Sequence, residues 1–310
     1  EMDGEGNLPI HLALQRAKLH HSATSLIQLL VGKYPGCLKH RNGRGSLPIH
    51  VASSAAGIDL IKFVGGGYPQ GLSETNEAGD LPIHTCSRAM TCSESVRWLA
   101  DRYPAGLGIE DSKGNLPIHV IMSQKYFTVV KIAEELTRVF VEMHPPCVRH
   151  RNHDGDLPIH MALRHRAEPM VRYLYEKYPD CVRVKGRTGC LPIHLATWGH
   201  SDFVRVFFER YPDGLKVEND NGVLPIHTAA FNNNEIALEF ADAYPRGLRH
   251  QDKVGNLPIH EAARSAKSHF MIKALAERYP EGLDEINHDG LTPVIAACED
   301  RLPKYRLDVV

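Results

Sequence analysis

The sequence predicts an α solenoid, built from about nine helix-turn-helix units that are joined by β-hairpin-like arms. The string Leu-Pro-Ile-His recurs along the 310 residues, and the steps between copies, including a divergent last one, are 39, 34, 35, 41, 34, 33, 33 and 35 residues. A Tyr-Pro pair follows seven of these strings. Self-similarity at a fixed period is typical of an array in which each unit packs on its neighbours.

The repeat runs through nearly the whole chain, so we expect one domain over residues 1–310. The eight complete strings begin at Leu8, Leu47, Leu81, Leu116, Leu157, Leu191, Leu224 and Leu257, and the divergent ninth is Thr292-Pro293-Val294-Ile295. The units are expected to begin near Asp3, Asn42, Asn76, Asp111, Asn152, Gly186, Asn219, Asp252 and Asn287, with the last unit incomplete.

Each unit is expected to contain two helices and an arm, as residues 189–219 illustrate. Pro192 has a fixed φ that suits the first turn of a short first helix. An apolar face at Val204, Phe207 and Phe208 predicts a second helix. That helix should end before Pro212, which lacks an amide hydrogen. The residues that follow predict an extended arm that ends in a tight turn.

Three segments depart from this pattern. Residues 125–143 carry two apolar clusters and predict a lengthened helix or turn, which could contact a partner. Residues 19–23 predict a longer turn between the first two helices. Residues 65–67 are three consecutive glycines at the end of a second helix, where each costs about 1 kcal/mol relative to alanine, so this end is expected to fray.

Composition narrows the class of protein. The 36 basic and 37 acidic residues give a formal charge of −1, so the chain lacks the bulk attraction to phosphate of nucleic-acid-binding proteins. No apolar run is long enough to cross a bilayer, and membrane insertion is not expected. Seven cysteines without metal-site spacing favour free thiols in a reducing intracellular compartment, cytoplasm or organelle interior. Met2 is not the first residue, so a targeting segment could have been removed.

The repeated string resembles the ankyrin repeat, whose signature is Thr-Pro-Leu-His-x-Ala on a 33-residue period. The resemblance covers nearly the whole chain, and Thr292-Pro293 restores the family threonine. Leucine replaces threonine in the other eight units. Because leucine has no hydroxyl to cap the first helix, each replacement is expected to cost about 1 kcal/mol, for which stacking must compensate.

The resemblance implies a structural role for the histidine of each string. In ankyrin repeats this histidine hydrogen-bonds the backbone and ties neighbouring units together. One repeat of separation is also too far for two such residues to bind a single metal ion. We therefore expect no metal and assign a structural role to His11, His50, His84, His119, His160, His194, His227 and His260.

No catalytic motif is present. The sequence contains no GxGxxG after a strand, no GxxxxGK[ST], no HExxH and no GxSxG. Adjacent acidic residues such as Glu134 and Glu135 point in different directions on a helix and are expected to be solvated. The sequence therefore predicts a protein that is not an enzyme and that has no cofactor.

The resemblance also implies a groove lined by the first helices and the arm tips. Trp198 and Phe231 hold the inward-facing position of consecutive units, where polar residues dominate elsewhere. Large apolar groups on a groove usually mark a binding site, although the two rings could instead pack onto neighbouring first helices. The partner-binding residues predicted from this position and its surroundings are Trp198, Phe231, Arg164, Arg264, His165 and Arg88.

Charge is unevenly distributed along the array. Residues 149–187 contain nine basic and five acidic residues, whereas residues 216–300 contain eight and fourteen. We expect a protein-interaction scaffold or adaptor, or a structural subunit of a larger assembly, whose partner offers an acidic or apolar segment. The alternative is a regulatory array that binds nucleic acid or an anionic ligand through residues 149–187. Only that alternative predicts affinity that falls steeply with salt.

Overall fold

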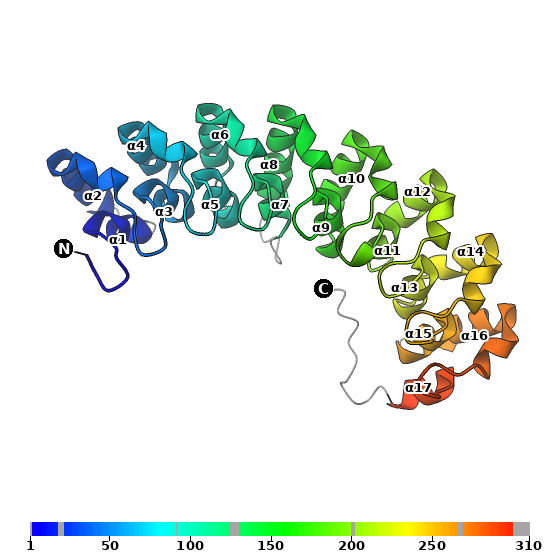
Figure 1. The fold of residues 1–310 in the computed structure, drawn as a ribbon. Helices are drawn as coiled ribbons and strands as arrows, with labels where there is room; N and C mark the ends of the chain where they lie inside the picture. Colours follow the sequence, from blue (N-terminus) through cyan, green and yellow to red (C-terminus); the bar gives the residue numbers. More distant parts are fainter. Residues whose placement is uncertain are drawn as a thin grey trace. The chain divides into compact units, whose positions relative to one another are not determined.

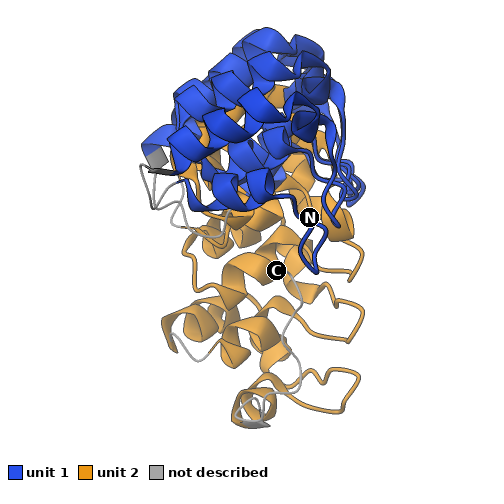
Figure 2. Cartoon of the chain, turned by 90° about the vertical axis from the view of Figure 1, so that its left-hand side faces the viewer, with its two compact units in different colours: residues 1–161 blue, residues 162–310 orange. Residues whose placement is uncertain are grey.

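A computed structural model of the chain describes residues 2–17, 22–90, 92–123, 130–199, 202–265 and 269–299. They belong to two compact units, residues 1–161 and residues 162–310 (Figure 2). Each unit is a series of helix pairs, and the described part of the chain contains no β-strand. The prediction of a helical repeat is confirmed at this level.

The first helices of the repeats form one row in each unit, and each of them begins at the proline of the repeated string (Figure 1). In residues 1–161 the helices α1, α3, α5 and α7 pack in succession, and in residues 162–310 the helices α11, α13, α15 and α17 do so. The first helices are α1 (Pro9–Arg16), α3 (Pro48–Ala55), α5 (Pro82–Ala89), α7 (Pro117–Met122), α9 (Pro158–Arg164), α11 (Pro192–Ala196), α13 (Pro225–Phe231), α15 (Pro258–Arg264) and α17 (Pro293–Glu299).

The second helices form the other row and end where the sequence predicts. They are α2 (Ser22–Lys33), α4 (Ile58–Gly67), α6 (Ser93–Arg102), α8 (Val130–Met143), α10 (Glu168–Lys177), α12 (Phe203–Arg210), α14 (Ile236–Ala243) and α16 (His269–Arg278). Each stops one residue before a Tyr-Pro or His-Pro pair. At Tyr211 the backbone leaves the helical region, with φ −142° and ψ 76°, and Pro212 starts a short 3₁₀ helix. The proline thus fixes the boundary, as expected.

The apolar core lies between the two rows. The isoleucine of every Leu-Pro-Ile-His string is at most 4% exposed, and Phe140, Phe207 and Phe240 are fully buried on second helices. Helix α8 has 14 residues and is longer than the other second helices, which agrees with the expected lengthening for residues 130–143. Residues 124–129, and most of the turn expected at residues 19–23, lie outside the described residues.

The prediction of β-hairpin-like arms is wrong for the described residues. At each Tyr-Pro or His-Pro pair the chain forms a 3₁₀ helix, such as η7 (Pro212–Lys216), and only two or three extended residues precede the turn. The turn at Asn219 closes with two backbone hydrogen bonds, from Asn219 N to Val223 O and from Gly222 N to Asn219 O, each 3.0 Å long. Successive turns share one more, from Lys253 N to Asn221 O. These bonds are too few for a strand ladder.

The turns depend on glycine at one position. Gly222 has φ +74°, and a Cβ atom there would lie 2.9 Å from the backbone nitrogen of Lys253 in the next turn. An L-residue is strained at this φ, and the backbone nitrogen cannot move away as a flexible side chain could. The close stacking of turns therefore requires the missing side chain.

Gly222→Ala is expected to lower the free energy of unfolding by about 1–3 kcal/mol, because it adds backbone strain and a steric clash. Urea unfolding followed by circular dichroism measures the change. Gly66→Ala is the matched control: Gly66 is exposed on helix α4, and a Cβ there meets nothing within 4 Å. The Gly66→Ala substitution should raise the free energy of unfolding slightly. Equal effects of the two substitutions would contradict the requirement for glycine at position 222.

The expected fraying at residues 65–67 is also wrong, because α4 continues to Gly67. A Cβ atom on Gly65 would lie 2.8 Å from the indole of Trp98, which comes from helix α6. A Cβ on Gly67 would lie 2.6 Å from Leu38. The glycines let neighbouring groups approach closely, and this packing offsets their low helix propensity.

Candidate functional site

The repeated histidine caps its own helix. In all eight complete strings the backbone N–H of the leucine donates to Nδ1 of the histidine three residues later, at 3.1–3.3 Å. This bond is half of a capping box, with histidine in the place of glutamate. The N–H of His50 donates to the carbonyl of Leu47 at 3.0 Å. The leucine therefore leaves fewer unpaired amides than its lack of a hydroxyl suggested.

The other ring nitrogen reaches the following unit. Nε2 of His194 lies 3.1 Å from the carbonyl oxygen of Val223, and Nε2 of His227 lies 3.2 Å from that of Asn256. The same contact is made by His50, His84 and His260, while Nε2 of His119 lies 3.2 Å from the carbonyl oxygen of His150, which precedes the next turn. Since Nδ1 accepts an amide hydrogen, Nε2 carries the ring proton and donates. For these six histidines the neutral tautomer thus links the start of a first helix to the following unit, whereas Nε2 of His11 is buried without a hydrogen-bond partner.

Burial keeps these rings neutral. It lowers the pKa of His50, His119 and His194 to about 4, and that of His227 to about 3, where the neighbouring His250 ring adds to the effect. Removing a ring from water penalises its charged form, and a second proton on Nδ1 would break the bond to the leucine amide. These residues are therefore poor candidates for a metal site or for a partner contact.

His227→Ala is expected to lower the free energy of unfolding by about 1–3 kcal/mol, because it leaves the Leu224 amide and two carbonyl groups without their partner. Urea unfolding at pH 8 measures this loss apart from acid effects. His269→Ala, on an exposed position of α16, is the control and should change stability little. If His227→Ala lowers the free energy of unfolding by no more than the control does, water molecules replace the hydrogen bonds of the histidine and its structural role is contradicted.

Trp198 and Phe231 lie together in residues 162–310. Trp198 lies two residues after the end of helix α11, Phe231 is the last residue of α13, and their ring centroids are 6.0 Å apart at an interplanar angle of 45°. Both side chains are half-buried. This geometry combines the two possibilities that the sequence left open, because the rings pack on each other and still present part of their surface. Nε1 of Trp198 is buried and has no hydrogen-bond partner.

Arg264 and Arg88 already hold carboxylates. Arg264 donates to Oε1 of Glu261 at 3.0 Å, and its side chain is only 12% exposed. In residues 1–161, Arg88 makes two hydrogen bonds to Asp80, of 2.5 and 3.1 Å. Each of the two guanidinium groups thus already pairs with a carboxyl group of the chain.

Arg164 is the last residue of α9 and His165 follows it, and both residues are half-buried. Further along the basic stretch, Arg172 lies over the ring of Phe203 at 5.1 Å and Arg183 over that of Tyr211 at 4.4 Å. Such contacts are cation–π interactions. In the described part of residues 162–187, several basic groups therefore bind neighbouring side chains of the chain itself.

Glu261 is a functional candidate that the sequence reasoning missed. Its side chain is 3% exposed, its Oε1 accepts from Arg264 and Asn256, and its Oε2 is buried without a partner. Burial raises its pKa to about 7. A signal was present, because Glu261 follows the repeat histidine at a place where other units have Leu12, Val51, Thr85, Val120, Met161, Leu195 and Thr228.

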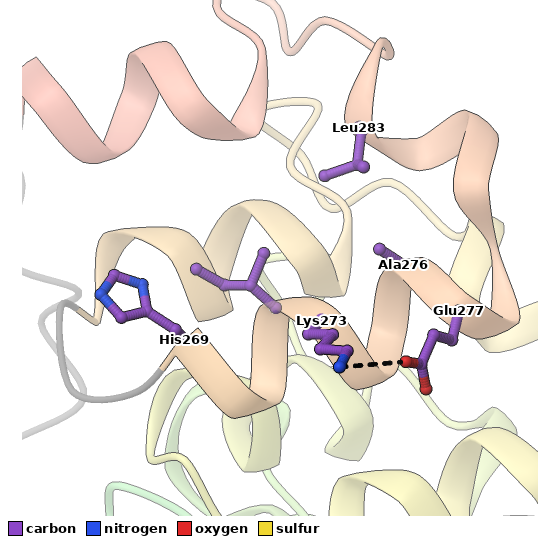
Figure 3. Close-up of a pocket in the computed structure, with 6 residues that line it drawn as sticks. His269, Lys273, Ala276, Glu277 and Leu283 are labelled. Carbon is purple, nitrogen blue, oxygen red and sulfur yellow. Dashed lines mark ion pairs between the residues drawn. The ribbon is translucent and has the colours of Figure 1, made fainter.

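A shallow hollow lies along helix α16 (Figure 3). Lys273 and Glu277 form an ion pair across it, with Nζ and Oε1 3.9 Å apart, and His269 and Leu283 contribute to its lining. These charged groups are exposed, and the hollow is open to solvent. It offers no buried polar atom that would select a ligand.

Within the described residues, no group of three His, Cys, Asp or Glu side chains is placed to hold a metal ion. No helix in the described ranges is both long and apolar enough to cross a bilayer. Comparison of the sequence with models of known protein families gives no match, and comparison with curated proteins gives none either.

Proposed function

We propose that this chain is a non-enzymatic protein-interaction array of the ankyrin type, which serves as a scaffold, an adaptor or a structural subunit of a larger assembly. The proposal rests on the half-buried Trp198–Phe231 pair on the row of first helices. Aromatic side chains with one face packed and one face accessible dominate the energetics of protein interfaces. The seven free thiols support a reducing, intracellular compartment for this interaction.

Of the two partner chemistries that the sequence left open, an apolar segment has the better support. It would cover the exposed faces of Trp198 and Phe231. An acidic segment would approach the buried carboxyl groups of Glu261 and Asp252, beside which Arg264 provides one positive charge. Like charges in a site of low dielectric repel strongly.

The alternative, binding of nucleic acid or an anionic ligand through residues 149–187, has less support. Arg172 and Arg183 cover aromatic rings, and Nζ of Lys185 donates to the carbonyl of Glu218 at 2.8 Å. Groups engaged in this way are not arranged to follow a phosphate backbone. A salt titration of any captured complex distinguishes the two functions, since only phosphate-led binding weakens steeply with salt.

The proposed function is tested by quantitative affinity capture with the wild-type chain and with Trp198→Ala/Phe231→Ala. Proteins that bind through this surface should be lost from the double variant. Phe270→Ala is the matched control, because Phe270 is a 54% exposed aromatic residue on helix α16. Support for the proposal requires at least one protein that the wild-type chain and the control capture and the double variant does not. If there is no such protein, the proposal fails.

A further inference from the structure

A small pocket opens beside the Trp198–Phe231 pair, among α11, α13 and α15. It is lined by Trp198, Phe231, Glu261, Thr228, His227 and Asn219, with Val223, and contains about 330 Å³ of empty space, its open mouth included. Its enclosed part admits a group of about the size of one water molecule. Most of its wall is apolar, so the few polar atoms decide which group can enter.

Most polar atoms of this wall already have partners. Oγ1 of Thr228 donates to the carbonyl of Pro225 and accepts from Thr197. Oδ1 of Asn219 accepts two backbone N–H groups of its own turn. Both ring nitrogens of His227 are engaged, by Leu224 N–H and by two carbonyl groups. These three side chains therefore have little capacity left for a ligand.

Two of the side chains that line the pocket each hold a buried atom without a partner: the donor Nε1–H of Trp198 and the acceptor Oε2 of Glu261. A buried polar atom without a partner costs free energy, so such atoms are rare in folded proteins. Here the donor and the acceptor belong to two side chains of the same small pocket. Together they call for a group that can accept one hydrogen bond and donate another.

We propose that this pocket receives the hydroxyl group of a serine or threonine side chain of the protein partner. The hydroxyl oxygen accepts from Trp198 Nε1–H, and its hydrogen is donated to Glu261 Oε2. The inference rests on the proposed function and adds the chemistry of the partner residue to it. The apolar wall formed by Val223 and the two aromatic rings would contact the Cβ or methyl group of that residue.

Other polar groups fit this wall less well. An ammonium or guanidinium group would face the N–H of Trp198 and would add positive charge beside Arg264, which already pairs with Glu261. A carboxylate would face Glu261 itself. A primary amide is larger than the enclosed space. A hydroxyl group also tolerates either protonation state of Glu261, because it can accept from a carboxylic acid as well as donate to a carboxylate.

The test uses a random peptide library, displayed and selected against the intact chain. Enriched peptides are first measured on Trp198→Ala/Phe231→Ala, and those that lose affinity are bound at the proposed surface. Each serine of these peptides is then replaced by alanine and each threonine by valine. We expect one such replacement to weaken binding to the wild-type chain about tenfold or more, because it leaves both buried atoms unpaired.

Glu261→Met should largely abolish this preference for the hydroxyl, because the methionine side chain is of similar length but can neither accept from the hydroxyl nor donate to it as an acid or an amide could. Glu277→Met, an exposed position on α16, is the matched control and should keep the preference. If Glu261→Met does not fold, as judged by circular dichroism, Trp198→Phe provides the same test by removing the indole N–H while keeping an aromatic ring.

The outcomes separate the two proposals. If no enriched peptide depends on Trp198 and Phe231, the proposed function fails. If peptides depend on the two rings but tolerate every serine and threonine replacement, the pocket holds an ordered water only and the hydroxyl inference is overturned. It is equally overturned if the essential residue is lysine, arginine, asparagine, glutamine or an acid.

Discussion

Acid is expected to unfold this protein as the pH falls from about 6.5 towards 4. The buried histidines are neutral in the folded state, with pKa values of about 4 for His50, His119 and His194 and about 3 for His227, against a usual value of 6.5. Below pH 6.5 these histidines bind protons in the unfolded chain but stay neutral in the folded chain. Stability contributed by these groups is complete above pH 6.5 and is lost as the pH falls.

The size of this effect follows from the same pKa values. At pH 5 each of the four histidines is expected to remove about 2 kcal/mol from the free energy of unfolding. Together they approach the total stability of a typical domain, about 5–15 kcal/mol. His50 and His119 belong to residues 1–161, and His194 and His227 to residues 162–310. Both units should therefore be sensitive to acid.

The contribution of Glu261 to stability depends on pH in the opposite direction. Because burial raises its pKa to about 7, the folded state binds its proton more tightly than the unfolded state does, and the corresponding stability is lost as the pH rises through 7. One such group cannot offset four histidines below pH 6.5. Stability should accordingly be highest near neutral pH and should decrease steeply on the acid side.

Urea unfolding at a series of pH values measures this dependence. His194→Gln is an informative variant, since its amide can accept and donate hydrogen bonds but does not titrate, and it should flatten the slope between pH 6.5 and 5. His269→Ala, which removes an exposed histidine, should leave the slope unchanged. Equal stability at pH 7 and pH 5 would contradict the neutral, buried state of the repeat histidines.

Trp198→Ala/Phe231→Ala is expected to weaken binding of a partner captured at this surface by about thirtyfold or more. Truncation of one aromatic hot-spot residue typically costs about 2 kcal/mol in binding free energy. The rings also pack on each other at 6.0 Å, so the double variant should lose some stability as well, about 1–3 kcal/mol. Affinity must therefore be measured by titration calorimetry where circular dichroism shows a fully folded chain.

A core variant provides the control for this experiment. Phe240 on α14 is 1% exposed, and Phe240→Leu should lower stability by about 1 kcal/mol while leaving the affinity of the folded protein unchanged. The two variants should thus affect stability and affinity in different proportions. If the Trp198/Phe231 variant binds normally, the rings serve only to pack neighbouring helices, and the interface lies elsewhere.

The sequence by itself determined where the elements begin and end. Pro192 starts helix α11, and Pro212 ends helix α12. Both effects arise because proline restricts φ and lacks an amide hydrogen, which are local properties of the chain. Gly222 marks a turn for an equally local reason, its positive φ. The period of the repeat then predicted that each unit would pack on the next. The extended arms were overestimated, since the pattern gave no sign of the 3₁₀ helix after each Tyr-Pro pair.

Only the tertiary structure decided which side chains meet between units. Nε2 of His194 lies against the carbonyl of Val223, 29 residues along the chain, and Trp98 of helix α6 packs against Gly65 of helix α4. Arg264, predicted to contact a partner, also binds Glu261 within the chain. These pairings depend on the distance and rotation between stacked units, which no local pattern encodes. The pocket beside Trp198 follows from the same stacking, because it leaves Nε1 of Trp198 and Oε2 of Glu261 buried without a partner.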